Sequence, residues 1–325
     1  MSLETILPFL QPIADLITDP NVSEVMVNGD GAIFMQRAGV LYRVHAKIEQ
    51  RYLSTAVKRI ARSLGEDISE SKPLLEARLP DGSRVAAAFP PCSLHGVTLT
   101  VRKFRPHWFT LDELVDVGAI PRPAADLLAS AVRNRRTILV SGGTDTGKTT
   151  FTKALIDFIP QSERLAVIED TMELKVDHPN VCRFEARKEV RDGGGNVSVP
   201  AVTVRDLVKA TLRHRPDRLI IGEVRGGEAF DLVDALNTGH AGSISTLHAN
   251  SAVQALSRLA SLALRADVDL PYRAIQAEIG DLIDLVVQVE RCGHERRVAH
   301  ILEVHGFDAG LNTYKAVSIY ESALN

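Results

Sequence analysis

Cysteines are few in this sequence, and long apolar runs are missing from it. The three cysteines, Cys92, Cys182 and Cys292, lie far apart and show no CxxC or Cys/His metal spacing. This pattern argues against a disulfide framework and fits reduced thiols in a cytoplasm. No uncharged apolar run approaches the roughly 18 residues that span a bilayer. Because the N-terminal stretch also lacks the basic start and the cleavage site of a signal peptide, we expect a cytoplasmic protein.

An excess of positive charge is also missing. Lys and Arg total 38 against 41 for Asp and Glu, which gives a net charge of -3. No overall positive field would therefore draw the chain onto nucleic acid or an anionic membrane. With 325 residues, 45% of them hydrophobic, the chain can bury a sizeable core, and its length suggests about two domains.

The first hundred residues indicate a small α+β domain. Alternating stretches such as SEVMVNG and AIFMQRAGVLYRV predict hairpin strands, and residues 49–65 carry apolar side chains at helical spacing. Two further strands are predicted within 83–91 and 95–104. The alternation then stops in a segment bounded by prolines. We therefore place an N-terminal domain at 1–106 and a linker at 107–120.

Residues 121–325 follow a different rhythm. Short strands of the buried type are separated by helices that start near Gly147, Val202, Gly227 and Ser251. This alternation is the signature of an α/β core with a mainly parallel sheet. Residues 181–200 interrupt it and predict a hairpin with a Gly-rich tip, and the tail of the chain predicts antiparallel strands at the edge. The predicted core strands are 136–141, 164–170, 217–223 and 243–248.

The strongest motif is a glycine-rich loop between a predicted strand and a predicted helix. Gly142 and Gly147 are separated by four residues and followed by Lys148 and Thr149, which is the spacing of a phosphate-binding loop. Its amide N–H groups and the helix N-terminus favour phosphate, Lys148 would contact the β- and γ-phosphates, and Thr149 would hold Mg²⁺. The predicted ATP-binding residues are Gly142, Gly143, Thr144, Asp145, Thr146, Gly147, Lys148, Thr149 and Thr150.

Asp145 places a carboxylate inside this loop. Aspartate tolerates left-handed backbone geometry, so the turn can form, but a carboxylate facing the phosphates would weaken binding. We therefore expect the side chain to point outward, to solvent or to a helix cap, and nucleotide binding to be retained.

Acidic residues follow two of the predicted core strands. Glu223 ends the strand LIIGE, where ligands of open α/β sheets bind, and it could hold Mg²⁺ through water or orient the attacking water. Glu169, Asp170 and Glu173 come just after an earlier strand. Carboxylates this close repel one another, and a bound cation or polarised water would relieve the repulsion. A surface carboxylate and a solvated loop remain the alternatives for these two groups.

Histidines and arginines complete the candidate set. His240 precedes a predicted strand and His248 ends it, a placement that favours His248 as a sensor of the γ-phosphate over a structural role. Arginines are plentiful, and a solvated surface position is the default for any one of them. The arginines considered for phosphate contact are Arg84, Arg102, Arg205, Arg213, Arg215 and Arg225.

Four segments in fixed order closely resemble the sequence boxes of the secretion traffic ATPases. GGTDTGKTT resembles Walker A, VIEDTMEL the Asp box, LRHRPDRLIIGEVRG Walker B and TGHAGSISTLHAN the His box. That family serves type II and type IV secretion, type IV pili and conjugation. SEVMVNG, LPDGSRVAAAFPP and VTLTVRKF are similar to its N-terminal domain. Within the family, the chain is most similar to the TrbB type of conjugal-transfer ATPases.

The resemblance implies a fold and a set of roles. The fold would be a RecA-like P-loop core preceded by a PAS-like α+β domain, assembled as a homohexameric ring with ATP between the two domains of a subunit. Glu173 would polarise the attacking water, and Glu223 would support Mg²⁺ and water. Arg84 and Arg102 match N-terminal arginines that reach the phosphates, so domain closure would complete the site.

The implied function is Mg²⁺-dependent ATP hydrolysis that drives domain motion in an inner-membrane conjugation or type IV secretion apparatus. The ring would lie on the cytoplasmic face, held peripherally by protein partners, without direct nucleic-acid contact. Two alternatives stay open. A RecA-like nucleic-acid motor is disfavoured by the mild acidity and by the lack of an aromatic, basic single-strand track. A nucleotide-binding scaffold with little turnover is the other, because Asp145 and Thr146 depart from the family's usual Gly-Ser.

Overall fold

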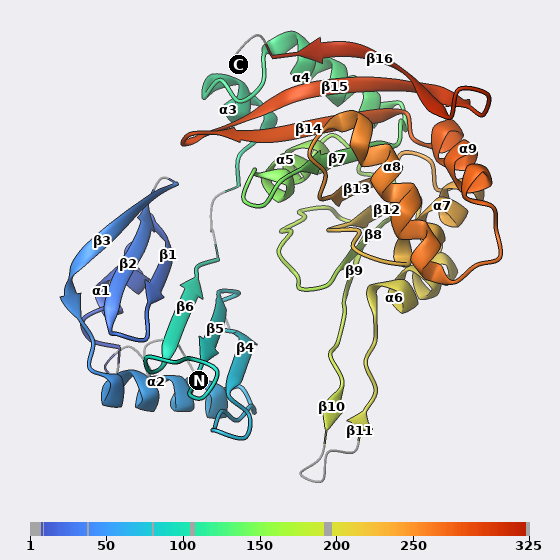
Figure 1. The fold of residues 1–325 in the computed structure, drawn as a ribbon. Coiled ribbons are helices and arrows are strands. Elements are labelled where there is room, and N and C mark those ends of the chain that lie inside the picture. The colour runs from blue at the N-terminus through green and yellow to red at the C-terminus, as the bar shows by residue number, and fades with distance from the viewer. Residues whose placement is uncertain are drawn as a thin grey trace. The chain divides into compact units, whose positions relative to one another are not determined.

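The computed structural model describes residues 8, 10–37, 39–79, 81–104, 108–191 and 197–322. The chain forms two compact units, Met1–His107 and Trp108–Asn325, each with its own hydrophobic core. Figure 1 draws the first in blue to teal and the second in green to red. The predicted Gly-rich tip, at 192–196, and residues 105–107, at the predicted boundary between the first domain and the linker, lie outside the described residues.

The first unit contains an antiparallel sheet with one face covered by helix. Among the described residues it has six strands in the order β3-β2-β1-β6-β5-β4. Helix α2 turns Leu53, Val57 and Ile60 into the core, as its apolar spacing predicts. The elements are α1 Ala14–Thr18, β1 Val22–Val27, β2 Ala32–Arg37, β3 Val40–Lys47, α2 Gln50–Ser63, β4 Leu74–Arg78, β5 Arg84–Ala88 and β6 Thr98–Arg102.

The second unit is built on a larger, mixed sheet. In the described part of the chain it has eight strands in the order β16-β15-β14-β7-β13-β12-β8-β9. The strands from β14 to β9 run parallel, whereas β15 and β16 are antiparallel because hairpins join them to β14. The strands are β7 Ile138–Gly142, β8 Leu165–Glu169, β9 Val181–Glu185, β12 Arg218–Ile221, β13 Ile244–Leu247, β14 Leu285–Cys292, β15 Glu295–Asp308 and β16 Thr313–Glu321.

The prediction of a mainly parallel sheet is therefore corrected. The sheets of this protein are mixed, since the first is antiparallel throughout and the second adds two antiparallel strands to a parallel core. The physical reason is the connection length: a short turn can only join antiparallel neighbours, whereas a parallel pair needs a crossover helix.

Helices cover both faces of the second sheet, as Figure 1 shows. Alternate residues of one strand supply the two cores: Ile138 and Val140 of β7 face α3, α4 and α5, whereas Leu139 faces the opposite layer. Fully buried strands of this kind are typical of parallel sheets. The helices are α3 Leu111–Asp116, α4 Arg122–Arg133, α5 Lys148–Ile156, α6 Val204–Thr211, α7 Glu228–Asn237, α8 Ala252–Ala263 and α9 Tyr272–Leu282, with short 3₁₀ turns at Leu212–His214 and Leu264–Ala266.

Two further segments complete the second unit. Strands β10 (Val190–Arg191) and β11 (Val197–Val199) pair as a ribbon that projects from the second unit in Figure 1. Helix α3 lies in the segment for which the sequence predicts a linker. A capping box between Thr110 and Glu113 starts this helix, whose apolar side chains join the core of the second unit.

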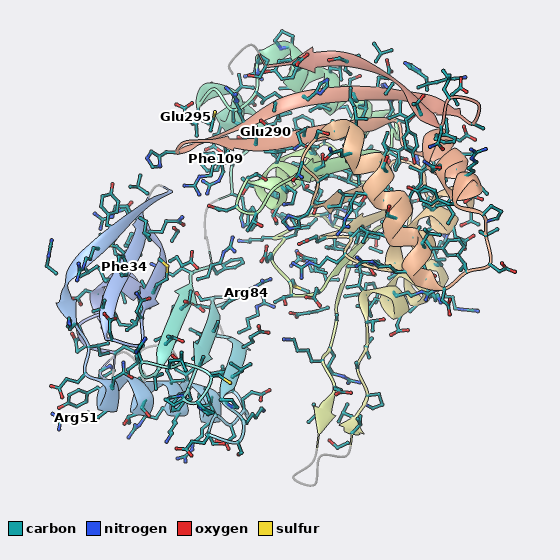
Figure 2. The ribbon with its side chains drawn as sticks, viewed as in Figure 1. Phe34, Arg51, Arg84, Phe109, Glu290 and Glu295 are labelled. Atoms are coloured by element: carbon teal, nitrogen blue, oxygen red, sulfur yellow. The ribbon has the colours of Figure 1, made fainter. Side chains whose placement is uncertain are left out.

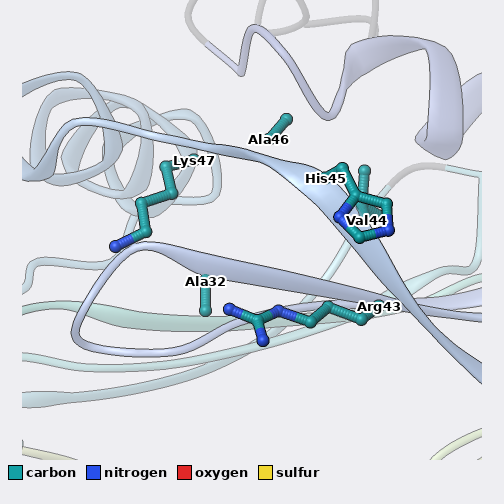
Figure 3. Close-up of a pocket in the computed structure, with 6 residues that line it drawn as sticks. All are labelled: Ala32, Arg43, Val44, His45, Ala46 and Lys47. Atoms are coloured by element: carbon teal, nitrogen blue, oxygen red, sulfur yellow. The ribbon is translucent and has the colours of Figure 1, made fainter.

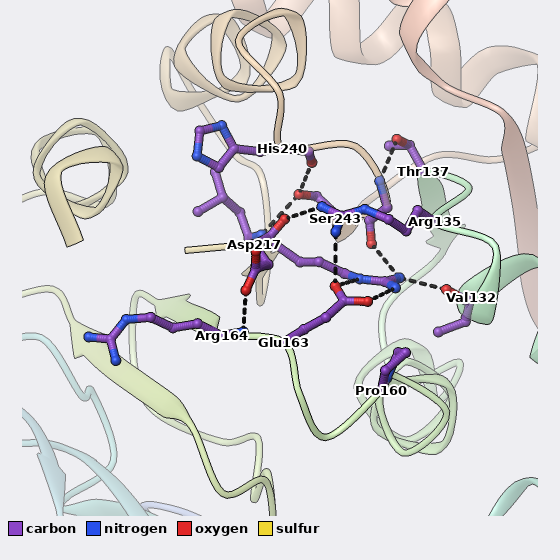
Figure 4. Close-up of polar contacts among 12 residues, drawn as sticks. Val132, Arg135, Thr137, Pro160, Glu163, Arg164, Asp217, His240 and Ser243 are labelled. Carbon is purple, nitrogen blue, oxygen red and sulfur yellow. Dashed lines mark hydrogen bonds and ion pairs between the residues drawn. The ribbon is translucent and has the colours of Figure 1, made fainter. Parts of the chain in front are cut away.

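A buried ion pair ties the amino ends of the core strands together (Figure 4). Arg218, the first residue of β12, is 0% exposed, and its guanidinium donates two hydrogen bonds of 2.7 Å to the Glu163 carboxylate. It also donates to the carbonyl oxygens of Val132 (2.6 Å) and Gly242 (3.3 Å). The hydrogen bond from Arg218 holds the pKa of Glu163 below its usual value. The pair therefore fixes strand β12 against the loops around it.

Replacing Glu163 by alanine is expected to lower the free energy of unfolding by about 3 kcal/mol, because it leaves the Arg218 guanidinium buried without its carboxylate. The pKa of Glu163 is lower in the folded state than in the unfolded state. The stabilisation that Glu163 provides is therefore complete above the unfolded-state pKa, and it is lost as the pH falls through the folded-state pKa. Denaturant unfolding at neutral and acid pH measures both effects. The exposed Glu321 serves as the matched control, and equal stabilities of the two alanine variants would contradict the prediction.

Candidate nucleotide site

The glycine-rich loop connects β7 to α5 with the geometry that its sequence predicts. Gly147 has a φ of 93°, in the left-handed region, and immediately precedes Lys148, the first residue of α5. A Cβ on Gly142 would lie 2.3 Å from the carbonyl oxygen of Val289 in β14, so only glycine fits there. The loop thus lies at the carboxyl end of a central parallel strand, where open α/β sheets bind ligands.

Lys148 lies over the loop that precedes it. Its Nζ donates to the carbonyl oxygens of Gly142 (3.1 Å) and Gly143 (2.7 Å), and the residue is 8% exposed. Burial lowers the pKa of Lys148, while the negative charge of Glu223 acts in the opposite direction. The Thr146 hydroxyl also donates a 3.0 Å hydrogen bond to the Gly143 carbonyl oxygen. The ammonium group is therefore held at the mouth of the loop.

A chain of polar contacts links the loop to the other predicted motifs. Nζ of Lys148 is 3.4 Å from Nδ1 of His248, and Nε2 of His248 is 3.0 Å from Oε1 of Glu223. The second oxygen of Glu223 accepts a 2.7 Å hydrogen bond from Arg225, whose guanidinium also lies 3.5 Å from Asp170. The structure thus brings together Lys148, Glu223 and His248, three of the residues that the sequence singles out.

The charges in this chain follow from its environment. Burial raises the pKa of Glu223, but the hydrogen bond from Arg225 and the charges of Arg225, His248 and Lys148 outweigh it, so the carboxylate stays ionised. Burial and the charge of Lys148 hold the pKa of His248 below its usual value, so its ring is neutral at pH 7. Its partners then assign the tautomer: Nδ1 accepts from Lys148, and Nε2–H donates to Glu223.

Glu169 differs from the acids that follow it. It is 4% exposed, and its Oε1 accepts hydrogen bonds from the backbone N–H groups of Glu173 (3.0 Å) and Leu174 (3.1 Å). Burial raises its pKa to about 7 against the effect of these hydrogen bonds. A Cβ on Gly222 would lie 2.7 Å from Cγ of Glu169, so a neighbouring glycine makes room for it. Glu169 therefore anchors the loop that carries Glu173.

Arg225, one of the arginines considered for phosphate contact, pairs with acids in the structure. Its hydrogen bond to Glu223, followed by the negative charges of Glu223, Asp170 and Glu173, raises the pKa of Arg225. The sequence led us to expect a cation or polarised water beside Glu169, Asp170 and Glu173, and the Arg225 guanidinium supplies positive charge near the last two of these acids. The available signal was its position, two residues after the acid that ends the strand.

The Asp145 side chain is neither open to solvent nor a helix cap. Its backbone is left-handed, with a φ of 57°, as expected for an aspartate in this turn. Its two carboxylate oxygens pair with Arg291 (2.9 Å) and Arg296 (2.8 Å) from the β14–β15 hairpin. The expectation that this side chain faces solvent or caps a helix is therefore wrong, since it pairs with two arginines. The sequence pattern carries no signal for a contact between residues so far apart in the chain.

Other predicted residues are distributed more widely. Thr149 and Thr150 lie half-buried in the first turn of α5, and Thr144 is exposed. Arg205 binds Asp231 (2.8 Å) and the Ala266 carbonyl, a structural arrangement. Arg213, Arg215 and His240 precede β12 and β13, and so lie at the amino ends of these strands, away from the phosphate loop. Nδ1 of His240 lies 2.9 Å from the Ala235 carbonyl oxygen.

Arg84 and Arg102 belong to the first unit. They lie directly opposite each other on β5 and β6, and Arg78 on β4 is the next partner in the same row. Figure 2 labels Arg84. Residues opposite one another in antiparallel strands share a face of the sheet, so these arginines are side by side.

Two pockets show where a ligand has room. One lies beside the phosphate loop and is lined by Gly143, Thr144, His248, Asn250 and Arg258 among others. The other lies in the first unit along β3 and Ala32, and it contains none of the residues of the four motifs (Figure 3). Of these two pockets, the first is therefore the one that adjoins the phosphate loop and His248.

A phosphate loop at the carboxyl edge of a RecA-like sheet, beside an ionised strand-end glutamate, defines a P-loop ATPase. In the parts of the chain that the structure describes, no helix is both long and apolar enough to cross a membrane. The model of the type II/IV secretion system protein family matches residues 9–321, and the chain belongs to that family.

Curated relatives and solved structures agree with this assignment. The chain is 35% identical to the type IV secretion system protein VirB11 of Brucella suis, with 96% of this chain and 92% of that protein covered. It is 32% identical to the conjugal transfer protein TrbB of Rhizobium radiobacter, over 90% of this chain and 86% of that one. The pilus retraction motor PilT with bound ADP shares the fold, with a TM-score of 0.61, 18% identity and coverage of 96% and 84%.

Proposed function

We propose that this chain hydrolyses ATP with Mg²⁺ and couples hydrolysis to domain motion in conjugative transfer or type IV secretion. The polar chain from Lys148 through His248 to Glu223 carries this proposal, because it joins the phosphate loop to an ionised carboxylate. The similarity to TrbB and VirB11 supports the choice of process. A hexameric ring, peripheral association with the inner membrane through protein partners and a PAS-like first unit belong to the same proposal.

The residues that would bind ATP and Mg²⁺ have suitable chemistry. The backbone N–H groups of the loop and the N-terminus of α5 suit phosphate oxygens, and Lys148 adds a positive charge beside them. Thr149 and Glu223 offer the oxygen ligands that Mg²⁺ prefers, and the ion offsets phosphate charge when bound. Glu173, on the loop anchored by Glu169, would polarise the attacking water. Neutral His248, which lies between Lys148 and Glu223, would sense the γ-phosphate through its contacts with these two residues.

Coupling to motion would come from the first unit. Arg84 and Arg102 lie side by side, and we propose that closure of the two units brings them to the phosphates and that loss of the γ-phosphate releases them. Glu24 on β1 lies directly opposite Arg102 in the same row, so in the closed state the phosphates would compete with a carboxylate for this guanidinium. This arrangement supports a site that is complete only in the closed state.

Replacing Arg102 by alanine is expected to lower ATP turnover about tenfold and leave thermal stability unchanged, because the arginine lies on the exposed face of its strand. Steady-state phosphate release, with kcat and KM separated, measures the effect. The matched control is Arg43→Ala, which removes an exposed arginine from β3 of the same sheet. Equal turnover in the two variants would refute the closure mechanism while leaving nucleotide binding intact.

A further inference from the structure

The β14–β15 hairpin extends past the strand on which the phosphate loop begins. Strand β14 pairs with β7 as far as Val289 opposite Gly142, and then continues to Cys292. Because β7 ends at Gly142, the last three residues of β14 and the first residues of β15 lie beyond the edge at which the loop starts. The hairpin is therefore the neighbour of the loop on that side of the site.

This extension carries two like charges opposite each other. Arg291 and Arg296 are direct partners in the β14–β15 ladder, an arrangement that is destabilising on its own. Glu290 and Glu295, labelled on the hairpin in Figure 2, are the partners of Arg297 and Cys292. Because faces alternate along a strand, these glutamates belong to the opposite face of the hairpin. They do not neutralise the two arginines from the same side.

Asp145 supplies the opposite charge between the arginines. Its Oδ2 lies 2.9 Å from Nη1 of Arg291, and its Oδ1 lies 2.8 Å from Nη2 of Arg296. Nε of Arg296 also donates to the Asp145 carbonyl at 2.9 Å. The stem of Arg296 reaches Gly147, where a Cβ would lie 3.1 Å from its Cδ. One arginine thus contacts the loop at both its middle and its last glycine.

We propose that Asp145, Arg291 and Arg296 form a loop clamp, which positions the phosphate loop and keeps the Asp145 carboxylate away from the phosphates. The inference rests on the proposed ATPase function and deepens it. The three side chains together carry one net positive charge, so a carboxylate that alone would oppose an anion becomes part of a cationic cluster. Asp145 and the two arginines are positioning residues, since they act through the backbone of the loop.

If the clamp exists, the effect of removing Arg296 on nucleotide binding depends on the charge of Asp145. Removing Arg296 takes the cluster from one net positive charge to none and removes the hydrogen bond from Arg296 to the Asp145 carbonyl, so nucleotide binding weakens. Removing the charge of Asp145 by Asp145→Asn keeps the left-handed backbone, which asparagine tolerates, and has a small effect. In the Asp145→Asn background, loss of Arg296 then matters little, because relief of its repulsion with Arg291 offsets the loss of its hydrogen bond to the backbone carbonyl of residue 145.

A double-mutant cycle tests the clamp by equilibrium binding of a fluorescent, non-hydrolysable ATP analogue with Mg²⁺. Arg296→Ala is expected to raise Kd about tenfold, Asp145→Asn less than about threefold, and the double variant about as much as Asp145→Asn alone. Arg296→Lys, which keeps the charge, should recover part of the affinity. The matched control is Arg273→Ala, an exposed arginine of α9 that should leave Kd unchanged.

Each outcome decides between the clamp and its failure. If Arg296→Ala changes Kd by the same factor, within twofold, in the wild-type and the Asp145→Asn backgrounds, the clamp is overturned. If Arg296→Ala does not fold, the same cycle is measured with Arg291→Ala. A wild-type chain that binds the analogue but releases no phosphate overturns the proposed function and leaves the cycle readable. A wild-type chain that binds no nucleotide overturns both.

Discussion

ATP hydrolysis by the Lys148→Ala variant is expected to be about 10²- to 10³-fold slower than by the wild type, the size of effect seen when one preorganised group that stabilises transition-state charge is removed. Lys148 is held at the mouth of the loop by two carbonyl oxygens, and its Nζ contacts His248 in the polar chain. Its removal therefore deletes a charge next to the phosphates and disconnects Glu223 from the loop.

Phosphate release at saturating ATP and Mg²⁺ measures this effect. Lys153→Ala is the matched control, since Lys153 lies on the same helix and pairs with Asp157. We expect the control to retain its turnover within about twofold, because its partner Asp157 lies at the end of the helix opposite the loop. A Lys148→Ala variant as active as the Lys153→Ala variant would remove the phosphate loop from the mechanism.

Glu173→Gln and Glu223→Gln are each expected to lower kcat about 10²-fold while KM changes less than threefold. Glutamine keeps the shape of the side chain but loses the negative charge that polarises water or holds Mg²⁺. For Glu223 the loss also removes the charge that Arg225 and His248 face. The two substitutions therefore act on chemistry and leave most of the binding energy for ATP in place.

Comparison of the two variants separates their roles. Because Glu173 is proposed to polarise the attacking water, its variant should stay slow when Mg²⁺ is raised, whereas excess Mg²⁺ should partly restore the Glu223 variant. Asp234→Asn, which changes an exposed acid on α7, is the matched control. Wild-type turnover in the Glu223→Gln variant would exclude the polar chain from catalysis.

Much of the second unit could be predicted because its signals are local. A buried strand, a glycine-rich turn and a helix follow one another within about twenty residues, and the structure has β7, the loop and α5 in that order. The acids at strand ends and His248 were predictable for the same reason, since the carboxyl ends of parallel strands share one edge of the sheet. Helices α4 and α9 were not identified, although both carry apolar faces.

Contacts between distant parts of the chain could not be predicted. Arg291 and Arg296 reach Asp145 only because β14 outruns β7, and a strand length of this kind has no marker in the sequence around Asp145. The distinction between buried Glu169 and half-buried Glu173 likewise depends on Gly222, which follows strand β12. Local pattern thus identified the chemical groups, whereas tertiary packing decided which of them face the loop.

Whether the chain is an ATPase that works through its phosphate loop is decided by phosphate release from ATP by the purified wild-type chain, in Mg²⁺ and again with the metal chelated. We expect steady release that requires Mg²⁺ and that the Lys148→Ala variant lacks. Release at the same rate from the wild type and from the Lys148→Ala variant, or none from either, would contradict it.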